Sequence, residues 1–429
     1  MRGPSCDHID YRAFGPLVDI SEESLILLAT DFRKRCFNKS TSESKYICRK
    51  NGSFNLVHIV QLDDFKLVIR IPVTGWGSGK TEKAAHAMES QVDTLRLIAQ
   101  GTTIPVPEIY DFDTTDDNVI GTPYMCMSFM PGNPVSDVWF KEPEDFIIQN
   151  NFMKRKYINT TREQFRLKIL KSLAQFMSQL SRFTFDKIGS ISNRSSTPAA
   201  SDPCYHWRET LDGTMKIVTS GPFDSASAYL EYHDVHDIHE HELVNAQAKI
   251  LKHMLAASPI NDIRGSFVLR PPDFNLQNVM VDEEGNVTGL IDWDFAQTVP
   301  HCIGYAAYPA WIRRDWDPAT YGWPTLRDSE DSPERLERYR AFYNEEMGKA
   351  LNWKGDWRFT KKSHITTSIW HAFHDEISSL ELCRMLVQEV IDVEDNEDAL
   401  DILYDIGAEE FEGWDHLRDH LKEIARIKP

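Results

Sequence analysis

The pattern of hydrophobic and polar positions divides the chain into a strand-rich first third and a helical remainder. Residues 46–73, YICRKNGSFNLVHIVQLDDFKLVIRIPV, predict three β-strands, because β-branched and aromatic residues fill the stretches between turns at Asn51-Gly52 and Asp63-Asp64. The runs IPVPEIYDFD and GTPYMCMSFMPGNPV predict two more strands. The first third therefore predicts a small antiparallel sheet.

Apolar residues at helical spacing predict helices on both sides of this boundary. In the first third these are Ile20–Cys36 and Thr81–Gly101. Beyond Pro131 they are Thr161–Ser181, His239–Ala257, Pro333–Leu351, Lys362–Ile391 and Glu412–Ile427. One β-hairpin is expected among them, with strands VMVD and VTGLI around the turn EEGN, and the Ser/Pro-rich stretch that starts at Ser192 is expected to be an exposed loop. Strands followed by helices predict an α+β fold with a ligand cleft between two lobes.

Composition narrows the class of protein. The 429 residues include 47 Lys and Arg against 66 Asp and Glu, a formal charge of −19, which argues against a nucleic-acid or anionic-membrane partner. No apolar run approaches the roughly 18 to 20 residues of a membrane-spanning helix, and the first residues lack the apolar stretch of a secretory signal, so we expect a cytoplasmic protein. The seven cysteines include no CxxC pair and are interpreted as reduced thiols.

Three oxygen-bearing side chains suggest a chemistry. Asp273 precedes Asn278 by five positions, and Asp292 follows at the end of the next predicted strand. Carboxylate and amide oxygens are the hard ligands that Mg²⁺ takes alongside phosphate oxygens. Phosphoryl transfer needs such a metal and a carboxylate that orients the attacking hydroxyl.

The string PDFNLQNVMVDEEGNVTGLIDWDFA resembles the catalytic and metal-binding segment of the aminoglycoside phosphotransferase and choline-kinase-like family, particularly its fungal members. Upstream, NGSFN with VIRIP is similar to that family's phosphate-loop hairpin and third strand, and IPVPEIY precedes a hinge-like MSFMPG. The resemblance implies a two-lobed protein-kinase-like fold. Residues 1–130 would form a nucleotide-binding lobe, and 131–429 a helical lobe with a catalytic hairpin at 266–296 and the substrate-binding helices.

The resemblance also implies roles for individual residues. Asp273 would be the catalytic carboxylate, and Asn278 and Asp292 would bind magnesium. The nucleotide, ATP, would be held by four further positions. These are Arg70 at the phosphates, Gly52 and Ser53 above them, and Met127 at the adenine.

Two departures from the family pattern leave two functions open. Pro271 stands where the family has a histidine, and Gln91 stands where a helix glutamate would pair with the strand cation, which is Arg70 in place of lysine. The first function is an ATP-dependent phosphotransferase that acts on a hydroxyl of a small, amine-bearing, cationic molecule. The alternative is a pseudokinase-like nucleotide-binding scaffold. The sequence does not predict an oligomeric state.

Three other patterns in the sequence each allow a simpler structural interpretation. GWGSGKT resembles a P-loop, but its first glycine, Gly75, comes one position late, so a flexible loop is favoured, from which Lys80 could still reach a phosphate. The histidine run at 233–241 lacks the i, i+4 spacing of a metal site and is interpreted as a polar approach to a helix. Between Met385 and Leu417 there are twelve acids and no Lys or Arg, which fits a substrate-attracting rim and a solvated helix face equally well.

Overall fold

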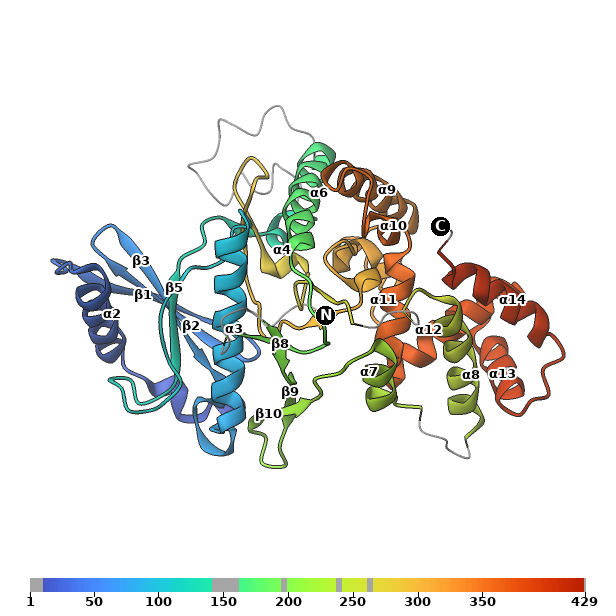
Figure 1. Ribbon diagram of the computed structural model, residues 1–429, viewed down its shortest axis with the longest axis horizontal. Coiled ribbons are helices and arrows are strands. Elements are labelled where there is room, and N and C mark those ends of the chain that lie inside the picture. The colour runs from blue at the N-terminus through green and yellow to red at the C-terminus, as the bar shows by residue number, and fades with distance from the viewer. Residues whose placement is uncertain (1–10, 141–161, 194–198, 237–240, 261–264, 428–429) are drawn as a thin grey trace. The chain divides into compact units, whose positions relative to one another are not determined.

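The computed structural model describes residues 11–140, 162–193, 199–236, 241–260 and 265–427 (Figure 1). By its contacts the chain forms two compact units. The first unit contains Met1–Pro131, Ser190–Gly221 and Thr288–Ala296. The second unit contains Gly132–Gly189, Pro222–Val287 and Gln297–Pro429.

The first unit is built on a five-stranded antiparallel sheet in the order β1-β2-β3-β5-β4. Its strands are β1 Ser44–Asn51, β2 Asn55–Leu62, β3 Phe65–Pro72, β4 Ile109–Asp113 and β5 Tyr124–Ser128. The first three lie where the sequence predicts them, with both turns as expected. Gly52 closes the first turn by donating its N–H to the carbonyl of Asn55 at 2.9 Å, and Asp63 takes a left-handed φ of 52° in the second.

Helices α2, Glu22–Phe37, and α3, Glu82–Gly101, confirm the two helices predicted in this part and lie on opposite faces of the sheet (Figure 1). Alternation along β3 decides which residue faces which helix, because successive strand residues point to opposite faces. Leu67, Ile69 and Ile71 pack with α2 in one apolar cluster. Arg70 therefore points to the other face, the face that α3 covers.

Further elements of the first unit come from distant parts of the chain. Short helical turns lie at α1 Tyr11–Phe14, η1 Gly15–Asp19, η2 Val73–Gly75 and η3 Gly77–Gly79. Additional strands are β7 Ser190–Ser192, β8 Ala199–Asp202, β9 Cys204–Glu209 and β10 Met215–Ser220, and β13 Val287–Leu290 begins one residue before this unit's last segment. The loop predicted from Ser192 onward is therefore wrong where the structure describes it. Its apolar positions are buried, as Cys204 and Tyr205 show, and a second hairpin, β9 with β10, was not predicted.

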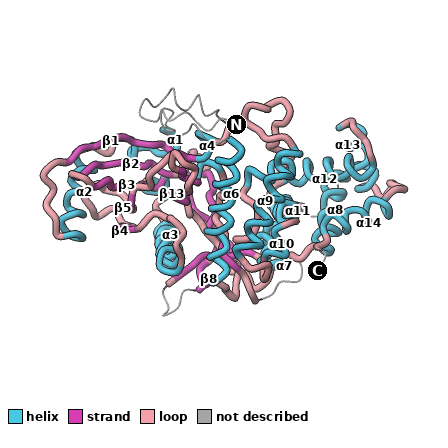
Figure 2. Tube along the Cα trace, turned by 90° about the horizontal axis from the view of Figure 1, so that it is seen from above, coloured by secondary structure: helices cyan, strands magenta, loops and turns pink. Residues whose placement is uncertain are grey.

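Helices dominate the second unit (Figure 2). They are α4 Val135–Val138, α6 Arg162–Ser178, α7 Ala226–His233, α8 Glu242–Ala257, α9 Pro333–Ala350, α10 Trp357–Thr360, α11 Ser363–Ala372, α12 Glu376–Ile391, α13 Asn396–Gly407 and α14 Trp414–Ala425. The 3₁₀ turns are η5 Gln179–Arg182, η6 Leu276–Asn278, η7 His301–Ile303 and η8 Ala310–Trp316. Its short strands are β6 Asn133–Pro134, β11 Val268–Leu269, β12 Val279–Val281 and β14 Thr298–Val299. The predicted α+β fold class, an antiparallel-sheet part followed by a mostly helical part, is confirmed.

The helix predicted over Lys362–Ile391 is wrong in one respect: the structure has two helices there, α11 and α12. The break comes at Asp375, which adopts an extended backbone and accepts a hydrogen bond from the N–H of Ser378, so it caps the second helix. The sequence contains the capping residue, Asp375, but apolar residues continue at helical spacing on both sides of it, so the break was not predicted. The predicted starts at Thr161 and His239 lie outside the described residues. In the described chain, no helix combines the length and apolarity needed to cross a bilayer.

Candidate active site

Arg70 is the centre of a charged cluster in the first unit. Its Nη2 lies 2.8 Å from Oδ1 of Asp292 and 2.8 Å from Oδ2 of Asp294, and its Nη1 donates to the other oxygen of Asp294. Arg70 is only 8% exposed. Burial acts to lower the pKa of its guanidinium, but the charges of Asp294 and Asp292 outweigh burial and raise it.

The carboxylate of Asp294 accepts hydrogen bonds from two further side chains. Gln91, on α3, donates its amide N–H to Oδ1, and Asn55, at the start of β2, donates to Oδ2 at 3.0 Å. A carboxylate that receives an arginine fork and two amide donors is well satisfied despite its partial burial. Asp294 therefore joins β2, β3, α3 and the 288–296 segment of the first unit.

Sequence reasoning missed Asp294 and misplaced the role of Gln91. The family pattern places the partner of Arg70 on the helix, at the position of Gln91, whereas the counter-ion of Arg70 comes from the segment that follows β13. The signal was present in the string IDWDFA, whose second aspartate, Asp294, lies two residues beyond Asp292. Spacing alone could not assign it a partner more than 200 residues away.

Asp273 lies in the second unit, in the loop between β11 and η6, and its side chain is exposed. Its carboxylate accepts hydrogen bonds from Nδ2 of Asn278 at 2.9 Å and from Nε2 of Gln277 at 3.1 Å. Nδ2 of Asn278 also donates to the backbone carbonyl of Asp273 at 3.0 Å. The five-residue spacing seen in the sequence thus places both side chains in one hydrogen-bonded turn.

The predicted magnesium ligands provide suitable donor chemistry. Because Nδ2 of Asn278 donates to Asp273, its Oδ1 is the atom available as a ligand. Asp292 has a positive φ of 62° and a side chain that is 41% exposed, so its carboxylate is open to solvent. Asn278 belongs to the second unit and Asp292 to the first. No group of three or more His, Cys, Asp or Glu side chains arranged for a metal occurs among the described residues.

The residues predicted to hold the nucleotide belong to the sheet. Gly52 and Ser53 form the turn between β1 and β2, and Met127 is a buried residue of β5 that pairs with β3 and β4. Next to Ser53, the ring of Phe54 stacks on Trp207 of β9, with centroids 4.4 Å apart and planes 7° apart. The turn above the predicted phosphate position is thus supported by an aromatic contact that the sequence did not predict.

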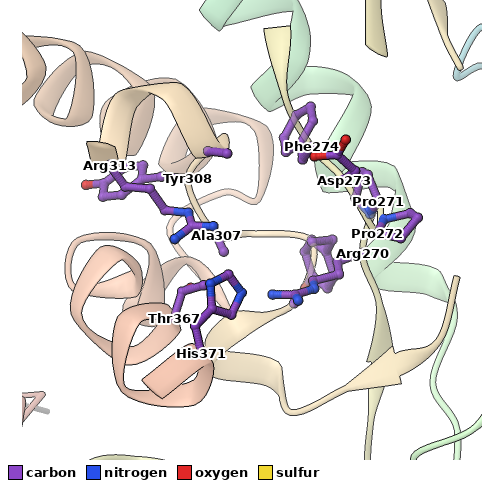
Figure 3. Close-up of a pocket in the computed structure, with 13 residues that line it drawn as sticks. Arg270, Pro271, Pro272, Asp273, Phe274, Ala307, Tyr308, Arg313, Thr367 and His371 are labelled. Atoms are coloured by element: carbon purple, nitrogen blue, oxygen red, sulfur yellow. The ribbon is translucent and has the colours of Figure 1, made fainter. Parts of the chain in front are cut away.

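A pocket of about 120 Å³ opens beside Asp273 in the second unit (Figure 3). The residues that line it come from the 270–274 loop, the 304–313 segment and α11. They are Arg270, Pro271, Pro272, Asp273, Phe274, Gly304, Tyr305, Ala307, Tyr308, Ala310, Arg313, Thr367 and His371. A hydrogen bond of 2.9 Å from the N–H of Ala310 to the carbonyl of Phe274 joins two of the walls. Pro271, which replaces the expected histidine, is one of the lining residues.

The competing motifs have structural explanations. Lys80, of the P-loop-like stretch, forms an ion pair with Asp116. His236 is buried and bonds through its two ring nitrogens to Asp234 and Ser379, at 2.8 and 2.6 Å, so it packs α12 and does not ligate a metal. His239 of that run lies outside the described residues.

Comparison with known proteins gives a family match. A family model described as "Phosphotransferase enzyme family" matches residues 40–302. A subtelomeric hrmA-associated cluster protein of Aspergillus fumigatus is 25% identical over 330 residues, which cover 65% of this chain and 63% of that protein. Clavilactone A biosynthesis cluster protein Y of Ampulloclitocybe clavipes is 27% identical over 235 residues, 53% of this chain and 54% of that protein. The chain thus spans less than two thirds of these relatives' length.

Solved structures were compared as well. A Ralstonia eutropha protein described as an aminoglycoside phosphotransferase is 13% identical, with a TM-score of 0.46 over 93% of this chain and 98% of that one. The aminoglycoside phosphotransferase APH(4)-Ia is 11% identical, with a TM-score of 0.43 over 94% of this chain and 99% of that one.

Proposed function

The chain belongs to the phosphotransferase enzyme family, and from this premise we propose that it transfers the terminal phosphoryl group of ATP to a hydroxyl of a small molecule. The family resemblance inferred from residues 272–296 and the upstream strands is confirmed by the match. The observation that supports the proposal is the turn in which Asn278 and Gln277 donate hydrogen bonds to the carboxylate of Asp273. That carboxylate borders a pocket of about 120 Å³ in the second unit.

The proposed step uses Asp273 as the base. The acceptor oxygen forms a bond to the terminal phosphorus of ATP, the bond from that phosphorus to the bridging oxygen breaks, and ADP leaves with its electron pair. The acceptor's proton passes to the carboxylate of Asp273. The two amide donors keep this carboxylate oriented, and positioning, together with electrostatic stabilisation, is what a protein contributes to phosphoryl transfer.

The first unit would bind the nucleotide. Arg70 would contact the phosphates, the turn at Gly52 and Ser53 would cover them with backbone N–H groups, and Met127 would border the adenine. Arg70 is held by Asp294, which leaves the guanidinium fixed in direction and not free to turn away. The stack of Phe54 on Trp207 would limit the movement of the covering turn.

Magnesium fits the donor set. Asn278 offers an amide oxygen and Asp292 a carboxylate, which are oxygen ligands of the kind that Mg²⁺ binds. When bound, the ion would neutralise charge on the phosphates of ATP. We propose these two residues as its protein ligands.

The test is ATP consumption by the purified chain with a panel of hydroxyl acceptors. Asp273→Asn should lower kcat by at least about 100-fold, while stabilisation by Mg-AMP-PNP, read as the unfolding midpoint, stays as in wild type. Asp328→Asn, at an exposed site in the same unit, is the matched control and should leave both unchanged. Full turnover by Asp273→Asn would rule out its role as base.

A scaffold without turnover is the second candidate, and one observation favours it. Arg70 occupies Oδ1 of Asp292, the proposed metal ligand, at 2.8 Å, and this contact must loosen before the carboxylate can give both oxygens to an ion. A scaffold predicts a rise in the unfolding midpoint with Mg-ATP but no ATP consumption with any acceptor. Pro271→His discriminates further, because a gain of turnover in that variant identifies a lapsed enzyme.

A further inference from the structure

The pocket beside Asp273 has an unusual balance of charge. Arg270 and Arg313 both line it, and Asp273 is the one carboxylate among the described lining residues. Figure 3 shows both guanidinium groups directed into the space that the ring of His371 also faces. In the described part of the chain, neither arginine forms an ion pair, and the one hydrogen bond of Arg270 is a long one, 3.4 Å, to the carbonyl of Ile303.

Other arginines in this protein behave differently. Four buried arginines each have a carboxylate oxygen between 2.5 and 3.6 Å away: Arg33, Arg70, Arg166 and Arg340. This is the general rule, since a charge removed from water is costly unless it is paired. Arg270 and Arg313 are partly buried, lie near each other and lack such a partner. A bound anion would provide one.

The pKa shifts of Arg270 and Arg313 agree with their lack of a carboxylate partner. Burial lowers the pKa of Arg313 to about 10, with Arg270 adding to the effect, and burial lowers the pKa of Arg270 as well. Burial, with the two arginines, also holds the pKa of His371 well below its usual range, so this ring is neutral at pH 7. Asp317 and Asp273 act in the opposite direction on Arg313, but burial and Arg270 outweigh them. The pocket therefore holds two positive charges, with Asp273 as the one carboxylate among its described lining residues.

A hydroxyl group completes the site. Thr367 is 2% exposed, lines the pocket, and its Oγ1 makes no hydrogen bond within the described residues. It lies one turn before His371 on α11, so the two side chains share a face of the helix. A buried hydroxyl without a partner is costly, and a ligand oxygen in this pocket would satisfy it.

We propose that the acceptor carries an anionic group, a carboxylate or a phosphate, which Arg270 and Arg313 bind while its hydroxyl lies at Asp273. This assignment rests on the proposed phosphotransferase function and names its substrate class. It departs from the amine-bearing acceptor expected from the family resemblance, because a cation would meet two arginines here. Arg guanidinium groups bind carboxylates and phosphates through two parallel hydrogen bonds.

The experiment uses four probes with one carbon skeleton: gluconate, glucose 6-phosphate, glucose and glucosamine. Binding is measured as the change in unfolding midpoint of the whole chain, without nucleotide. Gluconate or glucose 6-phosphate should stabilise wild type, glucose and glucosamine should not, and the anion that works identifies carboxylate or phosphate. Arg313→Gln should weaken that binding about 10-fold or more, and Arg270→Gln should do the same.

Matched controls keep the result interpretable. Arg338→Gln removes an exposed arginine of α9 in the same unit and should leave anion binding unchanged. Arg313→Gln should fold at least as well as wild type, because it removes repulsion from Arg270. Stabilisation by neither anion, equal stabilisation in Arg313→Gln and Arg338→Gln, or stronger binding of glucosamine would each overturn the proposal.

Measurements of ATP consumption distinguish a failure of the anionic-acceptor assignment from a failure of the proposed phosphotransferase function. Anion binding that depends on Arg313, without turnover of any acceptor, supports the pocket assignment and contradicts phosphoryl transfer. Turnover of glucosamine with a KM that Arg313→Gln leaves unchanged supports the transfer and overturns the assignment. If the arginines instead bound ATP, Arg313→Gln would raise the KM for ATP and leave that of the acceptor unchanged, which would also overturn it.

Discussion

The guanidinium of Arg70 binds both carboxylate oxygens of Asp294, with Nη2 2.8 Å from Oδ2. These residues are 224 positions apart in the chain. In the family pattern, a glutamate of the helix pairs with the cation of the third strand. In this protein that cation, Arg70, has its counter-ion on the 288–296 segment, which also carries Asp292. Arg70, the proposed phosphate contact, therefore also contacts Asp292, the proposed metal ligand.

The Asp294 contact should be important for stability. In Asp294→Asn, the new amide N–H groups would face the donors of Arg70, Gln91 and Asn55, so the free energy of unfolding should fall by about 3 kcal/mol. Urea denaturation measures this loss. Asp31→Asn, which removes an exposed partner of Arg35, is the control and should cost less than about 1 kcal/mol. Equal losses in the two variants would contradict the assignment.

Gln91→Glu should destabilise the protein, although it restores the residue that the family pattern has. Gln91 donates its amide N–H to Asp294, so a glutamate would place one carboxylate against another. We expect a loss of about 1 to 2 kcal/mol at pH 7, equal to a pKa shift of roughly one unit, which lessens as the pH falls and one carboxyl takes a proton.

Two controls test the cause of this effect. Gln100→Glu makes the same change at an exposed position of α3 and should cost less than about 0.5 kcal/mol. Combining Gln91→Glu with Asp294→Asn should cost less than the sum of the two single changes. A Gln91→Glu protein more stable than wild type would mean that the introduced carboxylate pairs with Arg70 after all.

His58 should make stability sensitive to mild acid. Burial, with Arg49 adding to it, lowers the pKa of His58 to about 4, against about 6.5 in an unfolded chain. Because the folded pKa is the lower one, its contribution is complete above pH 6.5 and is lost as the pH falls toward 4. Between pH 7.5 and 5 this amounts to about 2 kcal/mol.

Urea denaturation at several pH values tests this sign. The stability of His58→Gln should depend less on pH over this range than that of wild type, whatever its stability at pH 7. His416→Gln, at an exposed histidine, should keep the wild-type dependence. Parallel pH curves for wild type and His58→Gln would show that His58 is not the group responsible.

Gly407 lets two helices approach closely. A Cβ at this position, near the end of α13, would lie 1.9 Å from the carbonyl oxygen of Glu242 at the start of α8. Gly407→Ala should therefore lower the free energy of unfolding by about 1 to 3 kcal/mol, since backbone must shift. Asp401→Ala changes an exposed site on the same helix and should have a much smaller effect. Thermal unfolding of the two variants measures the difference.

The sequence by itself determined the elements whose signals are local. β-branched and aromatic residues between two turn signals in residues 46–73 predicted three strands, and Asp273 and Asn278 were identified by their five-residue spacing. Both signals lie within a short window of residues.

Only the tertiary structure decided which distant groups meet. Asp294 as the counter-ion of Arg70, and the convergence of Arg270, Arg313 and His371 on one pocket, join segments whose separation in the chain carries no periodic signal. Charge pairing depends on distance in space and on burial, and packing fixes both. The same limit applies to the acceptor. The family resemblance implied a cationic molecule, whereas the charges that line the pocket favour an anion.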